Sequence, residues 1–526
     1  MSEMNKRIAT EATLQRVASA LEAVVPGYEK YSAEYFDKLF SSMRTGKIYG
    51  TKIWKFASNP TSTCEKTRDN TGLVCQPSTD TVEGKDDYAD IPLFQWYECN
   101  YKRYDDGFAY PTAMLGDGAY QETGSVDCGS LQMTFYYKEI ETEAYTELLI
   151  SDSPNHAFGL QPWGLAKRAD GTVMPYFIQS RFFSGIASDG LLRSQPGLKP
   201  ARDQSYSNMI ANYQKKGKGY WGAGSNRMAF AQIFLAIKHA QKNVQKVFSG
   251  CTNYSIQLKA SVESADKHKY FPVSVADKDK VKVGSYVSVG YAAASDPDRS
   301  VSTLHAYADD VLVTKVEKIN DTTYGVYLDC EAFATAPVSG NPVYLASMHY
   351  RAGATDAVIG HHDGSPVSNT DSAHPYRIQG IEYHVGGYQV ASDTVMFFNA
   401  DSSKDVYYAP RGTDHTTDET KIKNTYKKVG TIPNPDKNGA DFWIGDVAHS
   451  EGVWYPSAKG SGEAQGIGDM CWAGGSQTSG SREYLMGGNL RNGGNAGLSY
   501  LNCRNGLSNT RWNYLAAYCI KQIFKH

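Results

Sequence analysis

The chain has 526 residues, of which 41% are hydrophobic and 21% charged, a balance that excludes a disordered chain and predicts several globular units. Its formal net charge is −3, so the basic surplus of a nucleic-acid-binding protein is absent. No apolar run approaches the roughly 20 residues that a membrane-spanning helix needs, and the N-terminus has no apolar signal core. We therefore expect no nucleic-acid partner, no membrane partner and no Sec-dependent export.

Tyrosine and glycine are unusually frequent, with 37 Tyr and 49 Gly beside only 19 Phe. Tyr presents a large, rigid, amphipathic face at low entropic cost, while Gly, Ser and Asn provide loops and adaptable hydrogen bonds. This composition is typical of recognition surfaces. It also fits a loop-rich β protein in which Tyr has no special role, and composition alone leaves both interpretations open.

The nine cysteines are odd in number and scattered, and no two of them form a CxxC pair. A zinc ribbon or a thioredoxin-like site is therefore disfavoured, and we expect mostly reduced, buried thiols. A bridge between Cys64 and Cys75, or between Cys503 and Cys519, is the alternative that the sequence leaves open.

The N-terminal unit, residues 1–30, contains a predicted helix over residues 9–25. Its apolar residues follow 3-4-3 spacing and form one seam: Leu14, Val17, Leu21 and Val24. A seam of this kind fits a trimeric coiled coil. It fits equally well a single helix packed on its own domain, because two heptads are too few to specify a coiled coil.

Residues 31–130 predict a β-rich attachment or connector region, with strands in GKIYGTKIWKF and IPLFQWYECNYKRY. Residues 131–251 predict further strands, in LQMTFYYKEI, AYTELLIS and VMPYFIQSRFF. A helix is then expected over residues 227–250, with one apolar face and Gly250 as its stop.

Residues 252–345 change to short, Val-rich, alternating strands with tight polar turns. They predict a small β-barrel or sandwich that is inserted between two parts of the chain with a different residue pattern. Residues 346–526 are rich in Gly, Trp, Asn and Ser, and within them residues 399–441 are expected to form an exposed excursion.

Signatures of catalysis are missing from the sequence: a GxSxG elbow between strand and helix, HExxH, a Walker loop and a dinucleotide fingerprint. One histidine cluster is a candidate metal site and consists of His361, His362 and His374 with Asp363 and Asp371. Ligands within one loop lack the fixed i, i+4 geometry of a specific site, so polar loop residues are the favoured interpretation. We expect no metal, no cofactor, no catalytic residue and no enzymatic activity.

The most informative stretch is GGNLRNGGNAGLSYLNCRNGLSNTRWN, residues 487–513. Asn recurs through it, and Asn is a poor strand and helix former that bonds to nearby backbone. Interleaved with Asn is an apolar and small set: Leu490, Ala496, Gly497, Leu498, Leu501, Leu507 and Trp512. The two sets predict a scaffold, with Gly at its tight turns, that exposes polar side chains to solvent. The alternative is that the Asn residues have turn roles only.

This stretch resembles the variable region of diversity-generating retroelement target proteins, which have a C-type-lectin-like fold. The resemblance rests on Gly487-Gly488, the Asn489–Asn492 run, the Ala496–Leu498 core and the Asn-rich residues 502–513. Two upstream segments also resemble this fold and the related formylglycine-generating-enzyme-like fold: HPYRIQGIEYHVGGYQVASD and MTFYYKEIETEAYTELLIS. The implied fold class is β-rich α+β, with one lectin-like domain in two parts, 131–251 and 346–526, around the inserted barrel.

In that family, template-primed reverse transcription substitutes at adenines, so Asn codons change to Ser, Tyr, Arg or Asp without a stop. The resemblance therefore implies a variable region at 487–514 whose polar and aromatic residues bind the ligand. These are Asn489, Arg491, Asn492, Asn495, Ser499, Tyr500, Asn502, Arg504, Asn505, Asn509, Arg511, Asn513 and Tyr514. Tyr and Arg would be anchors, and Asn and Ser the adaptable contacts.

The function that this implies is that of a phage receptor-binding protein, made in the host cytoplasm and carried on a tail or head fibre of the virion. Its partners would be a bacterial surface protein or glycan, and other virion structural proteins through the N-terminal region, in a homotrimer. The calcium-binding motifs of animal C-type lectins are missing, and Cys503 and Cys519 are too far apart in sequence to match the paired cysteines of formylglycine-generating enzymes. The alternatives are an enzyme, of the formylglycine-generating type or a glycan-degrading tailspike, and a decoration protein without a ligand.

Overall fold

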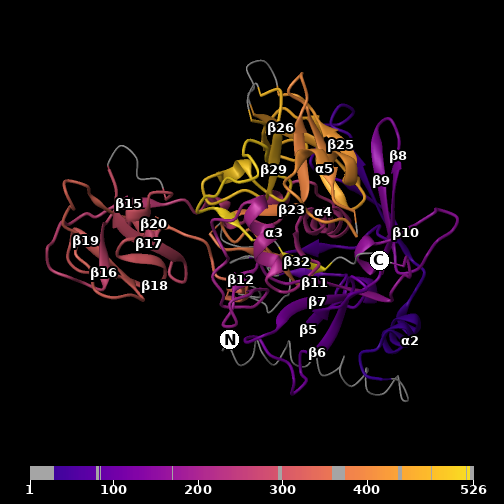
Figure 1. Ribbon diagram of the computed structural model, residues 1–526, viewed down its shortest axis with the longest axis horizontal. Helices are drawn as coiled ribbons and strands as arrows, with labels where there is room; N and C mark the ends of the chain where they lie inside the picture. The colour runs from indigo at the N-terminus through magenta and orange to yellow at the C-terminus, as the bar shows by residue number, and fades with distance from the viewer. Residues whose placement is uncertain are drawn as a thin grey trace.

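The computed structural model shows a larger body with a smaller lobe at one side (Figure 1). The residues that it describes are 29–78, 82, 84–168, 170–293, 299–357, 373–410, 412–435, 441–474, 477–516 and 518–521. The helix predicted over residues 9–25, and with it the coiled coil and the trimer, lies outside the described residues. The described chain is α+β and rich in β-strands, as the sequence predicted.

The first helix, α2 (Ala33–Met43), shows how local sequence places an element. Ser32 accepts a hydrogen bond from the backbone N–H of Tyr35 and so caps the helix. The buried face of α2 repeats at helical spacing and consists of Tyr35, Phe36, Leu39 and Phe40. Phe36 contacts the ring of Tyr176, which places α2 against the sheets of the larger body.

Two antiparallel sheets form the first part of the larger body, in the strand orders β10-β8-β9-β1-β2 and β11-β7-β5-β6. The first sheet contains β1 (Ile48–Trp54), β2 (Glu65–Arg68), β8 (Tyr136–Glu141), β9 (Tyr145–Ser151) and β10 (Gln161–Pro162). The second contains β5 (Trp96–Arg103), β6 (Ala109–Met114), β7 (Asp127–Met133) and β11 (Tyr176–Ser180). The strand pair predicted within residues 133–151 is present as the β8–β9 hairpin, with Tyr137 opposite Ile150.

The boundary predicted between residues 130 and 131 falls inside β7. On one side β7 pairs with β5, and on the other it pairs with β11. Strand β1 likewise pairs with β9. Residues 31–130 therefore share both sheets with the residues that follow, and the expectation of a separate connector region is wrong, because non-local strand pairing is invisible in local pattern.

The long helix α4 (Ser225–His239) lies buried in the centre of the larger body. Its Phe230 and Phe234 contact the ring of Phe135, so this helix holds the aromatic core together. The predicted helix ends earlier than expected, because Ala240 adopts a left-handed conformation at φ 50°. The side chain of Asn243 then caps a separate turn, η3 (Val244–Lys246), so the prediction of one helix to Gly250 is wrong.

The smaller lobe is a six-stranded sheet of residues 257–347, in the order β15-β20-β17-β18-β19-β16. The backbone N–H of Ser261 donates to the carbonyl of Pro272, which brings the two ends of the sheet together and nearly closes it. Its own core includes Phe271, Val287 and Leu345. The small barrel predicted in this part of the chain is therefore present. Its strands are β15 (Gln257–Lys259), β16 (Tyr270–Ser274), β17 (Tyr286–Tyr291), β18 (Ala308–Lys318), β19 (Thr323–Leu328) and β20 (Val343–Ser347).

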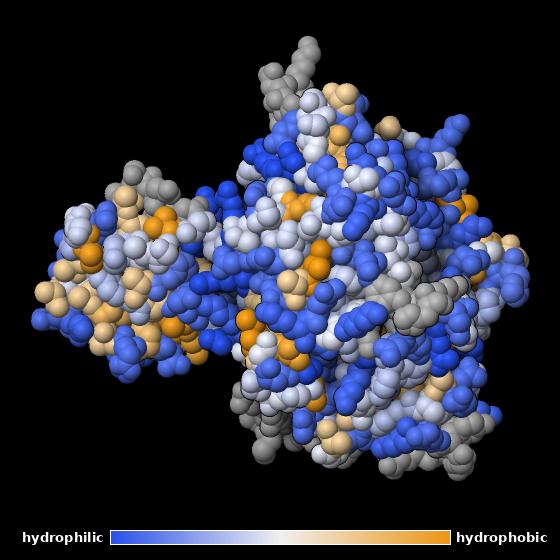
Figure 2. Space-filling model, viewed as in Figure 1, coloured by the Kyte–Doolittle hydropathy of each residue, from blue (hydrophilic) through white to orange (hydrophobic). Residues whose placement is uncertain are grey.

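Figure 2 shows apolar residues scattered among polar ones on the surface of this lobe. Val262, Val275 and Val283 are among its exposed apolar side chains. Single exposed apolar residues are ordinary on a protein surface and indicate no partner by themselves.

The last part of the chain forms a large sheet in the order β25-β24-β23-β29-β30-β28-β26-β27, with β31 beside β23. Strand β23 is buried along its whole length and forms the middle of this sheet. The strands are β23 (Tyr388–Phe398), β24 (Lys404–Tyr408), β25 (Lys427–Ile432), β26 (Phe442–Ser450), β27 (Val453–Lys459), β28 (Met470–Trp472), β29 (Ser481–Met486), β30 (Leu501–Asn502) and β31 (Tyr514–Leu515).

The exposed excursion predicted for residues 399–441 is wrong over its described part. That part contains β24, the helix α5 (Glu419–Thr425) and β25, and β24 pairs with β23. Ile422 of α5 is fully buried. Ile422 belongs to a core cluster with Tyr206, Val395 and Phe397, which lie outside residues 399–441, so one apolar contact anchors a largely polar stretch.

Shorter elements complete the fold. The remaining α-helix is α3 (Tyr206–Gln214), and the remaining strands are β3 (Cys75–Gln76), β4 (Lys85–Asp86), β12 (Gly185–Ile186), β13 (Leu192–Arg193), β14 (Tyr220–Ala223), β21 (Tyr376–Ile378), β22 (Ile381–Tyr383) and β32 (Tyr518–Lys521). The remaining single turns are η1 (Pro92–Phe94), η2 (Gly164–Ala166), η4 (Cys251–Asn253), η5 (Lys278–Lys280), η6 (Ser302–His305), η7 (Ala354–Ala357) and η8 (Gly493–Asn495). No helix in the described ranges is long and apolar enough to cross a membrane.

Neither of the two disulfides left open by the sequence is formed. Cys64 and Cys75 are both free and buried. Cys503 is also free, and Sγ of Cys471 lies 3.7 Å from its sulfur. Burial raises the pKa of the Cys64 thiol to about 12, which makes that thiol a poor nucleophile.

Candidate functional site

The stretch predicted to display variable side chains, residues 487–514, begins where β29 ends. Gly487 and Gly488 both have positive φ, at 82° and 77°, so the chain turns sharply there. A Cβ on Gly488 would lie 2.4 Å from Cβ of Ala496. The glycine pair is therefore required by the turn and by the close approach of the chain behind it.

The apolar framework predicted for this stretch is confirmed in its main members. Leu490, Leu498 and Leu501 are at most 1% exposed, and Ala496 is fully buried. Trp512 is 4% exposed and stacks on His349, while the guanidinium of Arg299, at the edge of the smaller lobe, lies over its ring. These contacts hold the stretch rigidly at the junction between the larger body and the barrel.

A buried carboxyl group supports the middle of the stretch. Oδ2 of Asp469 accepts a hydrogen bond of 2.8 Å from the backbone N–H of Ser499. Gly497 passes so close to this carboxyl that a Cβ there would lie 2.6 Å from Oδ1. Burial raises the pKa of Asp469 to about 8, against the lowering effect of the two backbone hydrogen bonds from Ser499 and Gly497.

Asn489 and Asn492 have turn roles in this structure. Oδ1 of Asn489 accepts from the backbone N–H of Arg491, and Oδ1 of Asn492 accepts from the backbone N–H of Asn489, each at 2.8 Å. This pair is the Asx-type local bonding that Asn favours. The alternative that the sequence left open, Asn as a turn former, therefore holds for these two positions.

Tyr500 and Tyr514 are buried, at 1% exposure each. Both rings contact the ring of Tyr388 from β23, with centroids 5.9 Å apart in each pair; Tyr500 is stacked on it and Tyr514 is edge-on to it. Burial raises the pKa of the Tyr500 phenol well above its ordinary value. The prediction that these two tyrosines are surface anchors is wrong. Burying their apolar area against Tyr388 is more favourable than exposing it to water.

The predicted ligand-binding positions thus divide by exposure. The exposed ones are Arg491, Asn495, Arg504, Asn509 and Arg511. The half-buried ones are Asn492 and Asn505. The buried ones, which cannot touch a ligand on the surface, are Asn489, Ser499, Tyr500, Asn502, Asn513 and Tyr514.

The exposed part has its own organisation around Arg504. The Arg504 guanidinium lies 4.5 Å above the ring of Trp472 and 2.9 Å from Oδ1 of Asp441. Asn505 donates to Oδ1 of Asn502, and Asn509 donates to Oδ1 of Asn505. We call Trp472, Arg504, Asn505 and Asn509 the Arg504 patch. In this patch Arg504 supplies a cation, Trp472 supplies the aromatic ring beneath it, and Asn505 and Asn509 supply amides that can form further hydrogen bonds.

Sequence reasoning missed the residues from distant segments that support this stretch. Nε2 of Gln232 on α4 donates to Oγ of Ser499, and Oε1 of the same Gln232 meets Nε2 of His449. Glu139 of β8 contacts Nδ1 of the same histidine at 2.7 Å. The histidine reaches Ser499 only through Gln232, so this chain positions the stretch and does not form a nucleophile–base pair. No local signal marks these partners.

The histidine cluster that was the candidate metal site lies mostly outside the described residues, since of its members only His374 is described. The ring of His374 packs on Tyr350, with centroids 5.0 Å apart. Across the described parts of the chain, no group of three or more His, Cys, Asp or Glu side chains is arranged to hold a metal ion.

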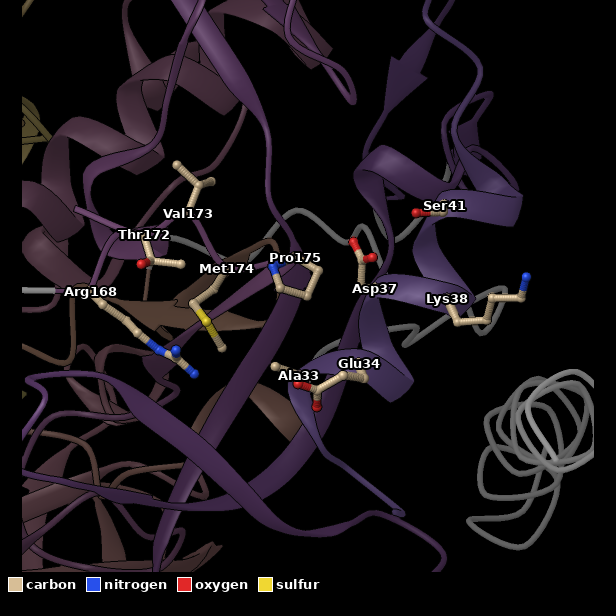
Figure 3. A pocket seen from close by; sticks show the side chains of 10 residues that line it. All are labelled: Ala33, Glu34, Asp37, Lys38, Ser41, Arg168, Thr172, Val173, Met174 and Pro175. Atoms are coloured by element: carbon tan, nitrogen blue, oxygen red, sulfur yellow. The ribbon is translucent and has the colours of Figure 1, made fainter. Parts of the chain in front are cut away.

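A hollow of about 680 Å³ lies between α2 and the turn that precedes β11. Figure 3 shows Glu34 and Asp37 on α2, with Arg168 and Met174 on the other side of the opening. Its lining mixes both signs of charge with a few apolar groups, and no residue of 487–514 contributes to it. The geometry therefore separates this hollow from the Arg504 patch.

No protein-family model matches the chain, and the search of curated proteins found no match. The residues of the 487–514 stretch and their contacts are therefore what supports a function.

Proposed function

We propose that the protein is a phage receptor-binding adhesin that recognises a bacterial surface ligand through the exposed residues of 487–514. The observation that carries this proposal is the division of that stretch. Leu490, Leu498 and Leu501 are buried in the body, while Arg491, Arg504 and Arg511 are exposed. A recognition surface needs a rigid framework whose exposed side chains can vary. A framework that is already ordered loses little conformational entropy when the ligand binds.

The charge of the stretch supports one kind of ligand. Residues 487–516 contain three arginines and no acidic residue, on a chain whose net charge is −3. The Arg504 guanidinium is stacked on Trp472 and bonds to Asp441 through one of its two Nη atoms, so it loses little freedom on binding. Its other N–H groups can donate to a carboxylate or phosphate of the ligand. The ligand proposed is accordingly an acidic group of a bacterial surface protein or glycan.

The finer fold assignment belongs to the same proposal. A C-type-lectin-like domain interrupted by the barrel would place its variable loops between two strands of one sheet. The stretch does run from β29, through β30, to β31, and all three strands belong to the sheet around β23. Several copies on one virion would raise a weak single-site affinity, because the second contact becomes intramolecular.

The test is a double variant, Arg504→Ala with Asn509→Ala, assayed for adsorption of the virion, or of the purified protein, to host cells. We expect adsorption to fall at least tenfold, with an unchanged unfolding midpoint, because exposed ion pairs contribute only about 0–1 kcal/mol to stability.

Arg68 offers a matched control in the same chain. It is exposed, its guanidinium lies 4.5 Å above the ring of Phe158, and it pairs with Glu147 at 3.1 Å. Arg68→Ala removes the same kind of contacts at a place unrelated to the stretch and should leave adsorption intact. Normal adsorption by the double variant would reject the Arg504 patch as the recognition surface.

A further inference from the structure

A second hollow, of about 170 Å³, lies between the sheet that contains β5 and β7 and the turn between α3 and β14. Four basic residues line it: Lys102, Arg103, Arg193 and Lys216. Asp127 is the one acidic residue in the lining that the structure describes. This hollow is separate from residues 487–514, none of which takes part in it.

The acidic groups at the hollow are already committed. Oδ2 of Asp127 contacts Nζ of Lys216 at 2.7 Å and Nη1 of Arg193 at 3.2 Å, and its Oδ1 accepts from the backbone N–H of Ser194. Arg193 also pairs with Asp189 at 2.6 Å. These two carboxylates compensate Arg193 and Lys216, and leave no acceptor for the other cations.

Arg103 is the group left without compensation. It is only 8% exposed, its Nε and Nη2 atoms have no hydrogen-bond acceptor, and it forms no ion pair with a described residue. Its guanidinium lies 5.4 Å from the centroid of the Tyr101 ring, which favours the cation weakly. A guanidinium keeps its charge when it is buried, so its desolvation is costly unless an anion joins it.

We propose that this hollow binds one small oxyanion, a carboxylate, sulfate or phosphate, with Arg103 as its principal partner. The lone buried guanidinium supplies directional donors, in a lining that has more basic than acidic residues. The volume admits a single anionic group with at most a small body attached, such as one acidic sugar residue. The hollow thus serves as an anion site independent of the Arg504 patch.

The experiment is isothermal titration calorimetry of the full chain at low ionic strength with sulfate, phosphate, acetate and glucuronate, each against a chloride background. We expect one saturable site per chain for at least one of these anions. Tighter binding of glucuronate than of acetate would identify an acidic sugar as the ligand, whereas tighter binding of sulfate or phosphate would identify a tetrahedral anion.

Two variants connect the site to Arg103. Arg103→Met removes the charge, keeps an unbranched side chain and should weaken binding at least tenfold. Arg68→Met, at an exposed and paired arginine, should leave binding unchanged. In the chloride buffer without any of the four oxyanions, Arg103→Met should melt no lower than the wild type, because it removes an uncompensated charge. Arg103→Lys, which keeps the charge, should retain part of the affinity. Failure of the wild-type chain to bind any of the four anions, or equal binding by the folded Arg103→Met variant, would overturn the proposal.

Discussion

Replacing Tyr500 by alanine distinguishes a structural role from a recognition role inside the 487–514 stretch. The side chain is 1% exposed, its ring lies beside Tyr388, and its hydroxyl accepts a hydrogen bond from Nδ2 of Asn492 at 3.2 Å. Truncation of a buried aromatic residue to alanine typically costs about 3–5 kcal/mol, since the cavity closes only in part. We therefore expect Tyr500→Ala to lower the free energy of unfolding by about that amount.

The comparison with Tyr500→Phe divides this cost between packing and hydrogen bonding. Phenylalanine keeps the ring against Tyr388 and loses only the hydroxyl, so its cost should be about 1 kcal/mol. Urea unfolding, followed by near-ultraviolet circular dichroism, measures both variants against the wild type. Adsorption to host cells by Tyr500→Phe should remain normal, because the hydroxyl does not reach the surface.

One result would refute this reasoning. If Tyr500→Ala unfolds at the wild-type urea concentration but no longer adsorbs to host cells, then the ring contacts the ligand and is not a core residue. The Arg504→Ala single variant provides the opposite expectation, namely unchanged stability with reduced adsorption, because its side chain is 42% exposed.

The remaining predictions concern the support beneath the stretch. Burial raises the pKa of Asp469 to about 8, above the value of about 3.9 in an unfolded chain, so the folded state binds the extra proton and stability falls as the pH rises from about 4 to about 8. Asp469→Asn should flatten that slope, measured as unfolding free energy at several pH values; an unchanged slope would mean that the other buried carboxyls carry it. Gly488→Ala should destabilise the protein by about 1–3 kcal/mol, since φ is 77° and the added methyl group would overlap Ala496. A melting temperature equal to that of the wild type would show that the turn can rearrange, whereas Gly506→Ala, where a Cβ meets nothing within 4 Å, is the matched control.

Local pattern alone was enough to predict several elements of this protein. Period-two alternation gave the β8–β9 hairpin and the strands of the small barrel, because each strand needs only its own residues to present a buried face. The Gly pair at 487–488 and the leucines of the stretch were also predicted as framework. Their chemistry, conformational freedom or apolar area, belongs to the residue itself.

Tertiary structure decided what each polar residue of the stretch does. The same residue type is a buried turn former at Asn489 and an exposed side chain at Asn509, and the local sequence does not distinguish the two. Tyr500 is core because β23 brings Tyr388 beside it, and Ser499 is held by Gln232 from the central helix. Whether a side chain is buried depends on its neighbours, and many of those neighbours come from distant parts of the chain. The sequence could therefore indicate where a recognition surface lies, while only the packed structure could divide its residues into those that support the surface and those that reach out from it.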